Sequence, residues 1–163
     1  MANLLRLAFV SFGFLGCSPF APGTVGTLGG VFLAWLIAWS GLPFLSTALV
    51  TCVVLYVIGR SLGDWSEQYA GKKDPGIFVV DEVIGYLVTI AWVGAPSWTA
   101  MVVAFFVFRF FDIFKPPPAR RLEALGGGDG IILDDVVAGL YGLAVMAVLR
   151  TFLLDPAAWA WGA

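Results

Sequence analysis

Two long stretches of the chain contain no charged residue. The first runs from residue 7 to residue 59, and the second from residue 83 to residue 108. A helix that crosses a membrane needs about 20 largely apolar residues. The first stretch is therefore long enough for two crossing helices, and the second for one crossing helix or two short ones.

Proline, glycine and polar residues divide these stretches into separate elements. Turns are predicted at residues 18–23, 41–43, 95–97 and 116–118, and polar connectors at 63–80 and 115–130. Five membrane helices are predicted between them, at residues 24–40, 44–62, 79–94, 97–114 and 131–154. The second is predicted to continue as a polar stalk through Tyr69. Residues 3–16 are apolar but contain Arg6, Ser11 and Gly13, which predicts a short interfacial or re-entrant helix.

Composition agrees with a membrane protein. The 163 residues are 60% hydrophobic and 12% charged, with a mean hydropathy of +0.94, whereas a soluble domain carries about 25% charged residues. We therefore expect one all-α domain over residues 1–163, a polytopic helical bundle in the bilayer. The net charge of −2 and the lack of a basic block argue against a nucleic-acid partner. No oligomeric state is predicted.

Basic residues occur in both polar connectors. They are Lys72 and Lys73 in the first and Lys115, Arg120 and Arg121 in the second. Two predicted crossings separate these connectors, so both are expected on one side, which the positive-inside rule makes cytoplasmic. The turn at 22–27 is expected there too. The turns at 41–43 and 95–97 then face outward, near Trp39, Trp92 and Trp98.

Acidic residues occupy positions at or inside the predicted membrane helices. They are Asp81, Glu82, Asp112, Asp134 and Asp135. An ionised side chain at bilayer depth costs roughly 2.5–3.5 kcal/mol, so such residues usually face the protein interior and mark a site. Asp81 and Glu82 could instead complement the dipole of a helix start. Asp134 and Asp135 are predicted about one turn inside the last helix, between wholly apolar flanks, which favours a functional role.

The acidic residues have basic neighbours that suit a phosphate ligand. Arg109 and Asp112 share one face of a helix, and Lys115 follows one turn later. Carboxylates from three helices would repel one another without a cation, and hard oxygen ligands suit Mg²⁺. Arg109 and Lys115 could then hold phosphate oxygens. Alternatively, Arg109 pairs only with Asp112, and Lys115 anchors the helix to lipid headgroups.

The turn at 22–27 begins a helix whose free N–H groups, with Thr24 and Thr27, could bind a phosphate. An ordinary helix cap and turn is the alternative.

The chain has no histidine, which excludes a histidine nucleophile and a Ser-His-Asp triad. Neither Cys17 nor Cys52 has an arginine six positions later, as a cysteine phosphatase loop would require. Carboxylate and metal chemistry remains, through a metal-activated water or an aspartyl-phosphate intermediate.

Four motifs now stand in order along the chain. They are Pro22-Gly23-Thr24-x-Gly26-Thr27, Val80-Asp81-Glu82-x-x-Gly85, Phe108-Arg109-x-x-Asp112-x-x-Lys115-Pro116-x-Pro118 and Gly127-Gly128-x-Gly130-Ile131-x-x-Asp134-Asp135-x-x-Ala138-Gly139. Together they resemble the phosphatidylglycerophosphatase A family. Thr27 stands where a serine is also common. The connector 119–126 matches weakly, so no role is carried over to Glu123 or Asp129.

The resemblance implies a multi-pass enzyme of the bacterial inner membrane, with its active site toward the cytoplasm. It implies Mg²⁺-dependent removal of the terminal phosphate from phosphatidylglycerophosphate, which yields phosphatidylglycerol and inorganic phosphate in phospholipid biosynthesis. The implied essential acids and metal ligands are Asp81, Glu82, Asp112, Asp134 and Asp135, with Arg109 and Lys115 as basic partners.

Two other classes are weighed against this one. A small ion or phosphate transporter could use paired acids to bind a coupling ion, although no inverted repeat is present and the acids are predicted near one face rather than at the midplane. A membrane phosphotransferase that moves a diacylglycerol phosphate would need an Asp-Gly-x-x-Ala-Arg motif, which Asp129-Gly130-Ile131-Ile132-Leu133-Asp134 does not match.

Overall fold

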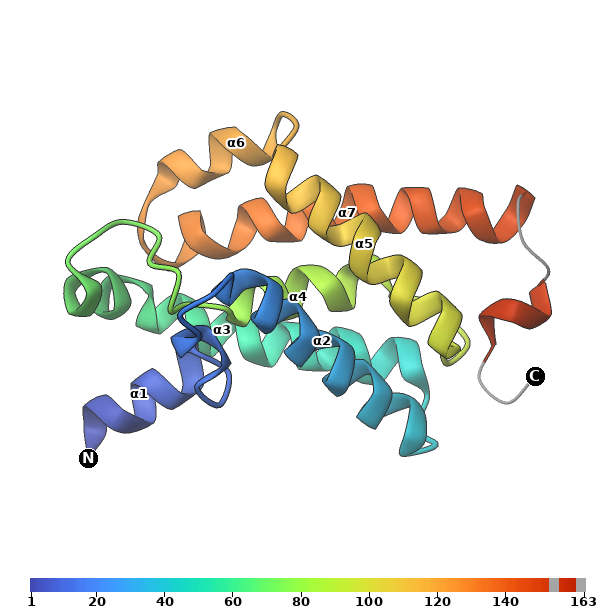
Figure 1. Ribbon diagram of the computed structural model, residues 1–163, viewed down its shortest axis with the longest axis horizontal. Helices are drawn as coiled ribbons and strands as arrows, with labels where there is room; N and C mark the ends of the chain where they lie inside the picture. The colour runs from blue at the N-terminus through green and yellow to red at the C-terminus, as the bar shows by residue number, and fades with distance from the viewer. Residues whose placement is uncertain (153–155, 161–163) are drawn as a thin grey trace.

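The computed structural model describes residues 1–152 and 156–160, and in these ranges the chain forms helices and turns without a β-strand. The predicted all-α bundle is confirmed (Figure 1). The element bounds are α1 Ala2–Val10, η1 Leu15–Cys17, α2 Pro22–Trp39, α3 Phe44–Ala70, α4 Val80–Thr89, α5 Trp98–Phe114, α6 Ala119–Leu122, η2 Glu123–Leu125, α7 Gly127–Phe152 and η3 Pro156–Trp159.

Three helices among the described residues are long and apolar enough to cross a membrane, namely α2, α3 and α7 with 18, 27 and 26 residues. α5 has 17 residues, the short end of the range that can cross. α4 has 10 residues, or about 15 Å against a hydrocarbon core of about 30 Å. α4 is therefore shorter than the predicted helix at 79–94 and too short to cross a membrane as a helix by itself, and the other helices enclose it.

α4 ends at Thr89, earlier than predicted, because tertiary contacts turn the chain toward α5. The chain remains apolar after Thr89, so the hydropathy pattern could not locate this end. Ser97, which precedes α5, donates its backbone N–H to the carbonyl of Trp159 and its hydroxyl to that of Ala158. Its hydroxyl oxygen also accepts the N–H of Ala100 and so caps α5. Residues 158 and 159 therefore hold the start of α5 in place.

α7 begins at Gly127 rather than at residue 131, so residues 127–130, which were predicted to belong to the polar connector, form its first turn. A Cβ on Gly128 would collide with the backbone of Arg60, which shows how closely α7 approaches α3. Asp134 and Asp135 consequently lie about two turns inside α7, roughly 10–12 Å from its start at 1.5 Å per residue, not one turn inside. The predicted last residue of this helix, Leu154, lies outside the described residues.

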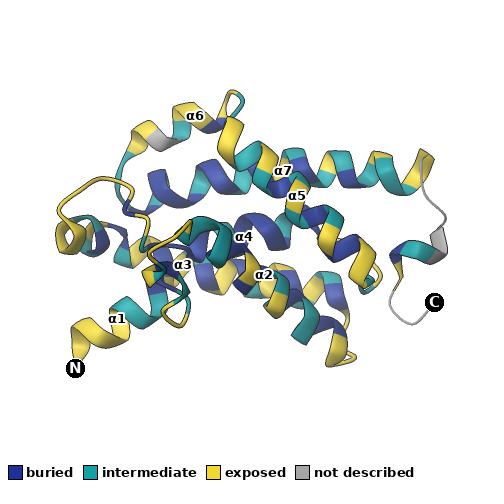
Figure 2. Ribbon diagram, viewed as in Figure 1, coloured by how far each residue is buried: buried dark blue, intermediate teal, exposed yellow. Residues whose placement is uncertain are grey.

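α4 forms the centre of the bundle and is buried on almost all sides (Figure 2). Its Gly85 faces α7, where an added Cβ would lie 2.7 Å from the carbonyl oxygen of Asp135. Thr89 donates its hydroxyl to the carbonyls of Gly85 and Gly139 at 3.0 and 3.3 Å. Small residues thus allow the two backbones to approach closely, as in other membrane helix pairs.

Replacing Gly85 with alanine should destabilise the bundle by about 1–3 kcal/mol, the usual cost of overpacking. The new Cβ would overlap the ring of Phe108 and the backbone of α7, and helix backbone cannot move aside as a flexible side chain can. The measurement is the thermal unfolding midpoint in detergent. Gly94→Ala is the matched control, because nothing lies within 4 Å of a Cβ there. Equal midpoints for both variants would contradict this packing.

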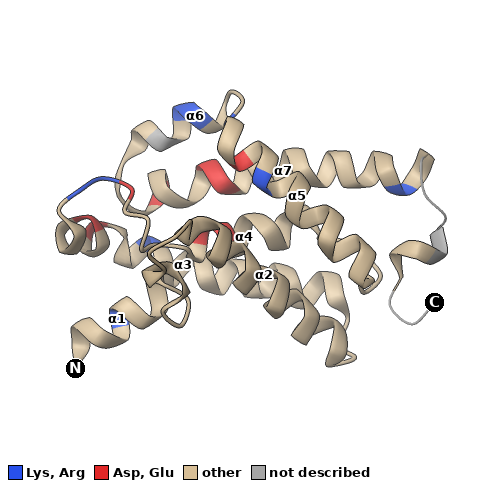
Figure 3. Ribbon diagram, viewed as in Figure 1, with Lys and Arg blue, Asp and Glu red and all other residues tan. Residues whose placement is uncertain are grey.

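The two polar connectors lie at one end of the bundle, as predicted. Lys73 from the first and Arg120 from the second line the same cavity, and charged residues gather at this end in Figure 3. The ring of Trp35 stacks on those of Trp39 and Trp98 where α2 ends and α5 begins, away from the connectors. The two predicted turns thus lie together near Trp39 and Trp98, although the separation of charge from tryptophan is incomplete, since Arg150 packs on the ring of Trp92.

Candidate active site

The first turn of α4 carries Asp81 and Glu82 into the interior. The connector before this turn is fixed by the N-terminal segment, since the N–H of Val79 donates to the carbonyl of Val10 at 2.8 Å. A Cβ on Gly16 would collide with the backbone of Ile77, so this contact is close. Oδ1 of Asp81 accepts the N–H of Glu82 at 3.0 Å. The N-terminal segment therefore fixes the connector before α4, and the side chain of Asp81 stabilises the first turn of the helix.

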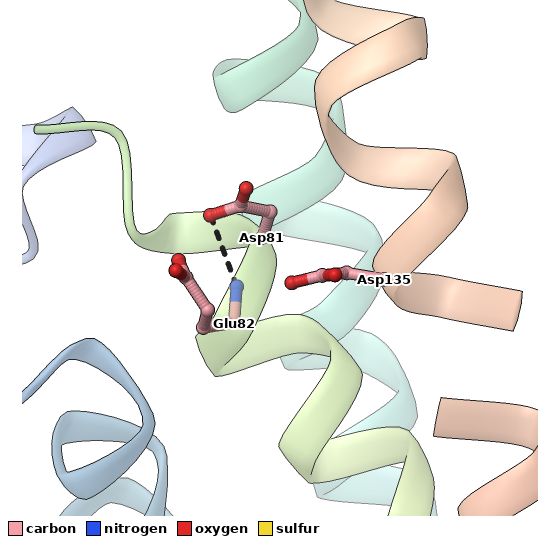
Figure 4. Close-up of side chains that lie close together, drawn as sticks. All are labelled: Asp81, Glu82 and Asp135. Atoms are coloured by element: carbon pink, nitrogen blue, oxygen red, sulfur yellow. Dashed lines mark hydrogen bonds between the residues drawn. The ribbon is translucent and has the colours of Figure 1, made fainter. Parts of the chain in front are cut away.

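Asp135 approaches this turn from α7. Figure 4 shows its carboxylate directed from α7 toward those of Asp81 and Glu82 on α4. One carboxylate oxygen from each of the three residues lies within 4.8 Å of the other two. Asp81 and Asp135 are only 6% and 3% exposed. We call Asp81, Glu82 and Asp135 the carboxylate cluster.

The carboxylate cluster has the chemistry of a divalent cation site. Three buried negative charges at this separation repel one another strongly unless a cation or protons neutralise them. Oε2 of Glu82 is buried and accepts no hydrogen bond from the described part of the chain, so it is available as a ligand. Carboxylate oxygens are the ligands that Mg²⁺ and other hard cations prefer.

The other two predicted acids already have basic partners. Arg109 donates to Asp112 one helical turn away on α5, and Lys115 donates to Oδ2 of Asp134 at 2.6 Å. The ion pair between Arg109 and Asp112, weighed above as an alternative, is therefore present. The charge of Asp112 nevertheless acts on both Glu82 and Asp135, so this pair borders the carboxylate cluster.

The first turn of α2 closes another side of the site. A Cβ on Gly23 would meet Oε1 of Glu82 and lie 3.2 Å from Nη1 of Arg109, so a larger residue here would displace these two side chains of the site. Thr24 lies in the same turn and is half-buried. Thr27 is fully buried and donates its hydroxyl to the carbonyl of Gly23 at 2.9 Å. The structure thus places both threonines on the first turns of this helix, and their binding of phosphate stays a prediction.

A sequence model of the phosphatidylglycerophosphatase A family matches residues 8–150. The chain belongs to this family. The resemblance drawn from the four motifs is confirmed, and the protein is a membrane-type phosphatase. No solved structure matches the chain.

Curated relatives of this phosphatidylglycerophosphatase A chain cover most of its length. A phosphatidylglycerophosphatase A from Haemophilus influenzae is 34% identical over 94% of this chain and 93% of its own. One from Escherichia coli is 33% identical over 90% of this chain and 83% of its own. A putative phosphatidylinositol-3-phosphatase from Bacteroides thetaiotaomicron is 39% identical over 83% of this chain and 87% of its own.

The structure gives roles to two acids of this family member that the sequence analysis did not identify. Asp74, in the first connector, acts electrostatically on Asp81 and Asp134; nothing in its local sequence distinguishes it from a solvated loop residue. Asp129 accepts the hydroxyl of Tyr56 at 2.6 Å and Nε of Arg60 at 3.0 Å, which ties α7 to α3. The spacing of Tyr56 and Arg60 by one helical turn was the available signal for that contact.

Proposed function

We propose that the protein hydrolyses the terminal phosphate of phosphatidylglycerophosphate, with Mg²⁺ held by the carboxylate cluster at the cytoplasmic end of the bundle. The observation that carries this proposal is the convergence of three carboxylates, two of them buried, close to the ion pairs of Arg109 with Asp112 and Lys115 with Asp134. The names of the relatives from Haemophilus influenzae and Escherichia coli support the substrate.

Each group of residues has a distinct role in this proposal. Asp81, Glu82 and Asp135 would hold the cation, which when bound would supply a Lewis acid for the phosphate oxygens and lower the pKa of a coordinated water. Arg109 and Lys115, which pair with Asp112 and Asp134, would supply positive charge to the phosphate oxygens. Such prearranged positive charge stabilises the loose, in-line transition state of phosphoryl transfer.

Asp134 is suited to orient the attacking water. Its Oδ2 accepts from Lys115, while its Oδ1 is buried and accepts no hydrogen bond from the described residues. In the reaction, the water oxygen bonds to phosphorus, the bond from phosphorus to the glycerol oxygen breaks, and that oxygen takes a proton. Water and the phosphate monoester become phosphatidylglycerol and inorganic phosphate. Of the two routes left open above, we favour direct attack by water.

The orientation proposed here rests on the basic residues of the two connectors. Lys73 and Arg120 line one cavity at the connector end, and Lys72 and Arg121 are their neighbours in the sequence. Such residues face the cytoplasm in bacterial inner-membrane proteins. A lipid phosphate in the inner leaflet would then lie at the depth of the carboxylate cluster. Membership of a phosphatase family argues against the transporter alternative.

The relative from Bacteroides thetaiotaomicron supports a second candidate substrate, phosphatidylinositol 3-phosphate. The deciding experiment compares phosphate release from both lipids by the purified protein in mixed micelles with Mg²⁺. We expect the larger kcat/KM for phosphatidylglycerophosphate. Preference for the inositol lipid would replace the proposed substrate, and no release from either lipid would contradict the hydrolase proposal.

Replacing Arg109 with lysine should lower kcat/KM by about 10–100-fold, the usual effect of losing a charged group that supports a metal or phosphate site. Lysine keeps the positive charge near Asp112 but loses the planar fork of donors that fits a phosphate. The measurement is lipid hydrolysis at several substrate concentrations. Arg60→Lys is the matched control, because Arg60 pairs with Asp129 outside the site. Equal effects in the two variants would argue against a specific role for Arg109.

A further inference from the structure

A cavity of about 260 Å³ lies at the connector end of the bundle, and none of the residues of the carboxylate cluster lines it. Four charged residues line it: Glu67, Lys73, Asp74 and Arg120. Gly126, Gly130 and Ile131 close it on the side of α7. The family motifs do not explain this cavity, because only its α7 wall coincides with one of them.

The cavity brings together basic groups from segments that are far apart in the sequence. Lys73 belongs to the first connector, and Arg120 lies on α6 in the second. Nζ of Lys73 lies 3.9 Å from the position of a Cβ on Gly126, immediately before the N-terminus of α7. The positive end of the helix dipole therefore adds to the two basic side chains. Of the two acids, Glu67 is turned toward the connector backbone, since its Oε1 accepts the N–H of Asp74 at 3.5 Å.

The cavity adjoins the proposed reaction site. Asp74 lines the cavity, and its charge also acts on Asp81 and Asp134. Ile131 lies one turn before Asp134 and Asp135 on the same helix. An anion leaving the carboxylate cluster toward the connector end would pass Ile131 and enter the cavity that Lys73 and Arg120 line.

We propose that this cavity binds a phosphate dianion through Lys73 and Arg120 and is the route by which inorganic phosphate leaves the site. This inference rests on the proposed hydrolase function. The lipid product can diffuse sideways into the bilayer, but a free phosphate ion is insoluble there and must reach water at the connector end. The two acids in the cavity weaken the hold on phosphate, as release requires.

The test compares two double variants that remove the same charge. Lys73→Gln with Arg120→Gln alters the cavity, whereas Lys72→Gln with Arg121→Gln alters the exposed neighbours that do not line it. Binding of inorganic phosphate is measured by ³¹P NMR line broadening in EDTA, so that the metal site does not contribute. Inhibition of lipid hydrolysis by added phosphate is measured with Mg²⁺. We expect the first variant to weaken both by about five- to thirtyfold, given roughly 0.5–1 kcal/mol for each exposed charge contact, and the second to change neither.

A further arm separates free phosphate from a lipid headgroup as the ligand. Both double variants are assayed in vesicles of phosphatidylcholine with and without phosphatidylglycerol. If only the response to the anionic lipid changes in the cavity variant, while phosphate binding in EDTA stays normal, the cavity holds headgroups and the exit route is overturned. If phosphate binding and inhibition weaken equally in both double variants, the loss of net positive charge alone explains the effect. That result would also overturn the proposed exit route. Phosphate binding without lipid hydrolysis by the unaltered protein would refute the hydrolase proposal but not the cavity as an anion site.

Discussion

Asp135→Asn should reduce lipid hydrolysis by at least about a hundredfold while leaving the bundle folded. Partners outside the ligand shell already contribute about 10–100-fold to the affinity or activity of metal sites, and Asp135 is one of the three residues proposed to hold the cation. Asparagine has nearly the same shape, so the close packing of α7 on α4 should survive. The missing charge should therefore affect chemistry far more than folding.

The stability of this variant offers a readout that is independent of turnover. Without divalent cations, Asp135→Asn should unfold at the same temperature as the unaltered protein or at a higher one, because it removes repulsion among three buried carboxylates. With Mg²⁺, the unaltered protein should become the more stable of the two. A variant that was merely misfolded would be less stable under both conditions.

Asp129→Asn is the matched control for this experiment. It removes an acid from the same helix by the same change, but Asp129 contacts Tyr56 and Arg60 rather than the carboxylate cluster. We expect a modest loss of stability and nearly normal hydrolysis. Near-normal hydrolysis by Asp135→Asn would show that Asp135 is not required for catalysis. If both variants were equally inactive, the loss of activity could not be assigned to the carboxylate cluster.

Chelation of divalent cations should abolish hydrolysis, and Mg²⁺ should restore it. Without a bound cation the cluster supplies no positive charge to a phosphate dianion, so both substrate binding and transition-state stabilisation should fail. The measurement is phosphate release in EDTA and after dialysis into Mg²⁺. Potassium chloride at matched ionic strength is the control for simple screening. Full activity after exhaustive chelation would contradict the proposed cofactor.

The same titration has a thermodynamic counterpart. A ligand present at 100 times its dissociation constant stabilises the folded state by about 2.7 kcal/mol, so Mg²⁺ should raise the unfolding temperature of the unaltered protein. Asp135→Asn should lose most of this increase, whereas Asp129→Asn should keep it. An equal increase in all three proteins would place the cation elsewhere.

Local pattern was sufficient for most of the helices but not for α4. The helix starts near Val80 and Trp98 follow from a change between polar or turn residues and apolar ones. The end of α4 at Thr89 does not, since the chain remains apolar and Ser97 is held in place by the distant carbonyls of Ala158 and Trp159. Similarly, Gly127–Gly130 has a composition typical of a loop, and it forms a helix because packing against α3 favours it.

The sequence by itself determined the membrane-type helical bundle, the family and the acids and bases of the candidate site, since charged residues in apolar surroundings are costly and therefore rare. Only the tertiary structure decided how they divide: Asp81, Glu82 and Asp135 converge, while Asp112 and Asp134 pair with Arg109 and Lys115. The physical reason is that helical spacing orders residues along one helix, whereas distances between side chains on different helices depend on how closely the helices pack. Here that packing is set by contacts such as Gly85 against the backbone of Asp135.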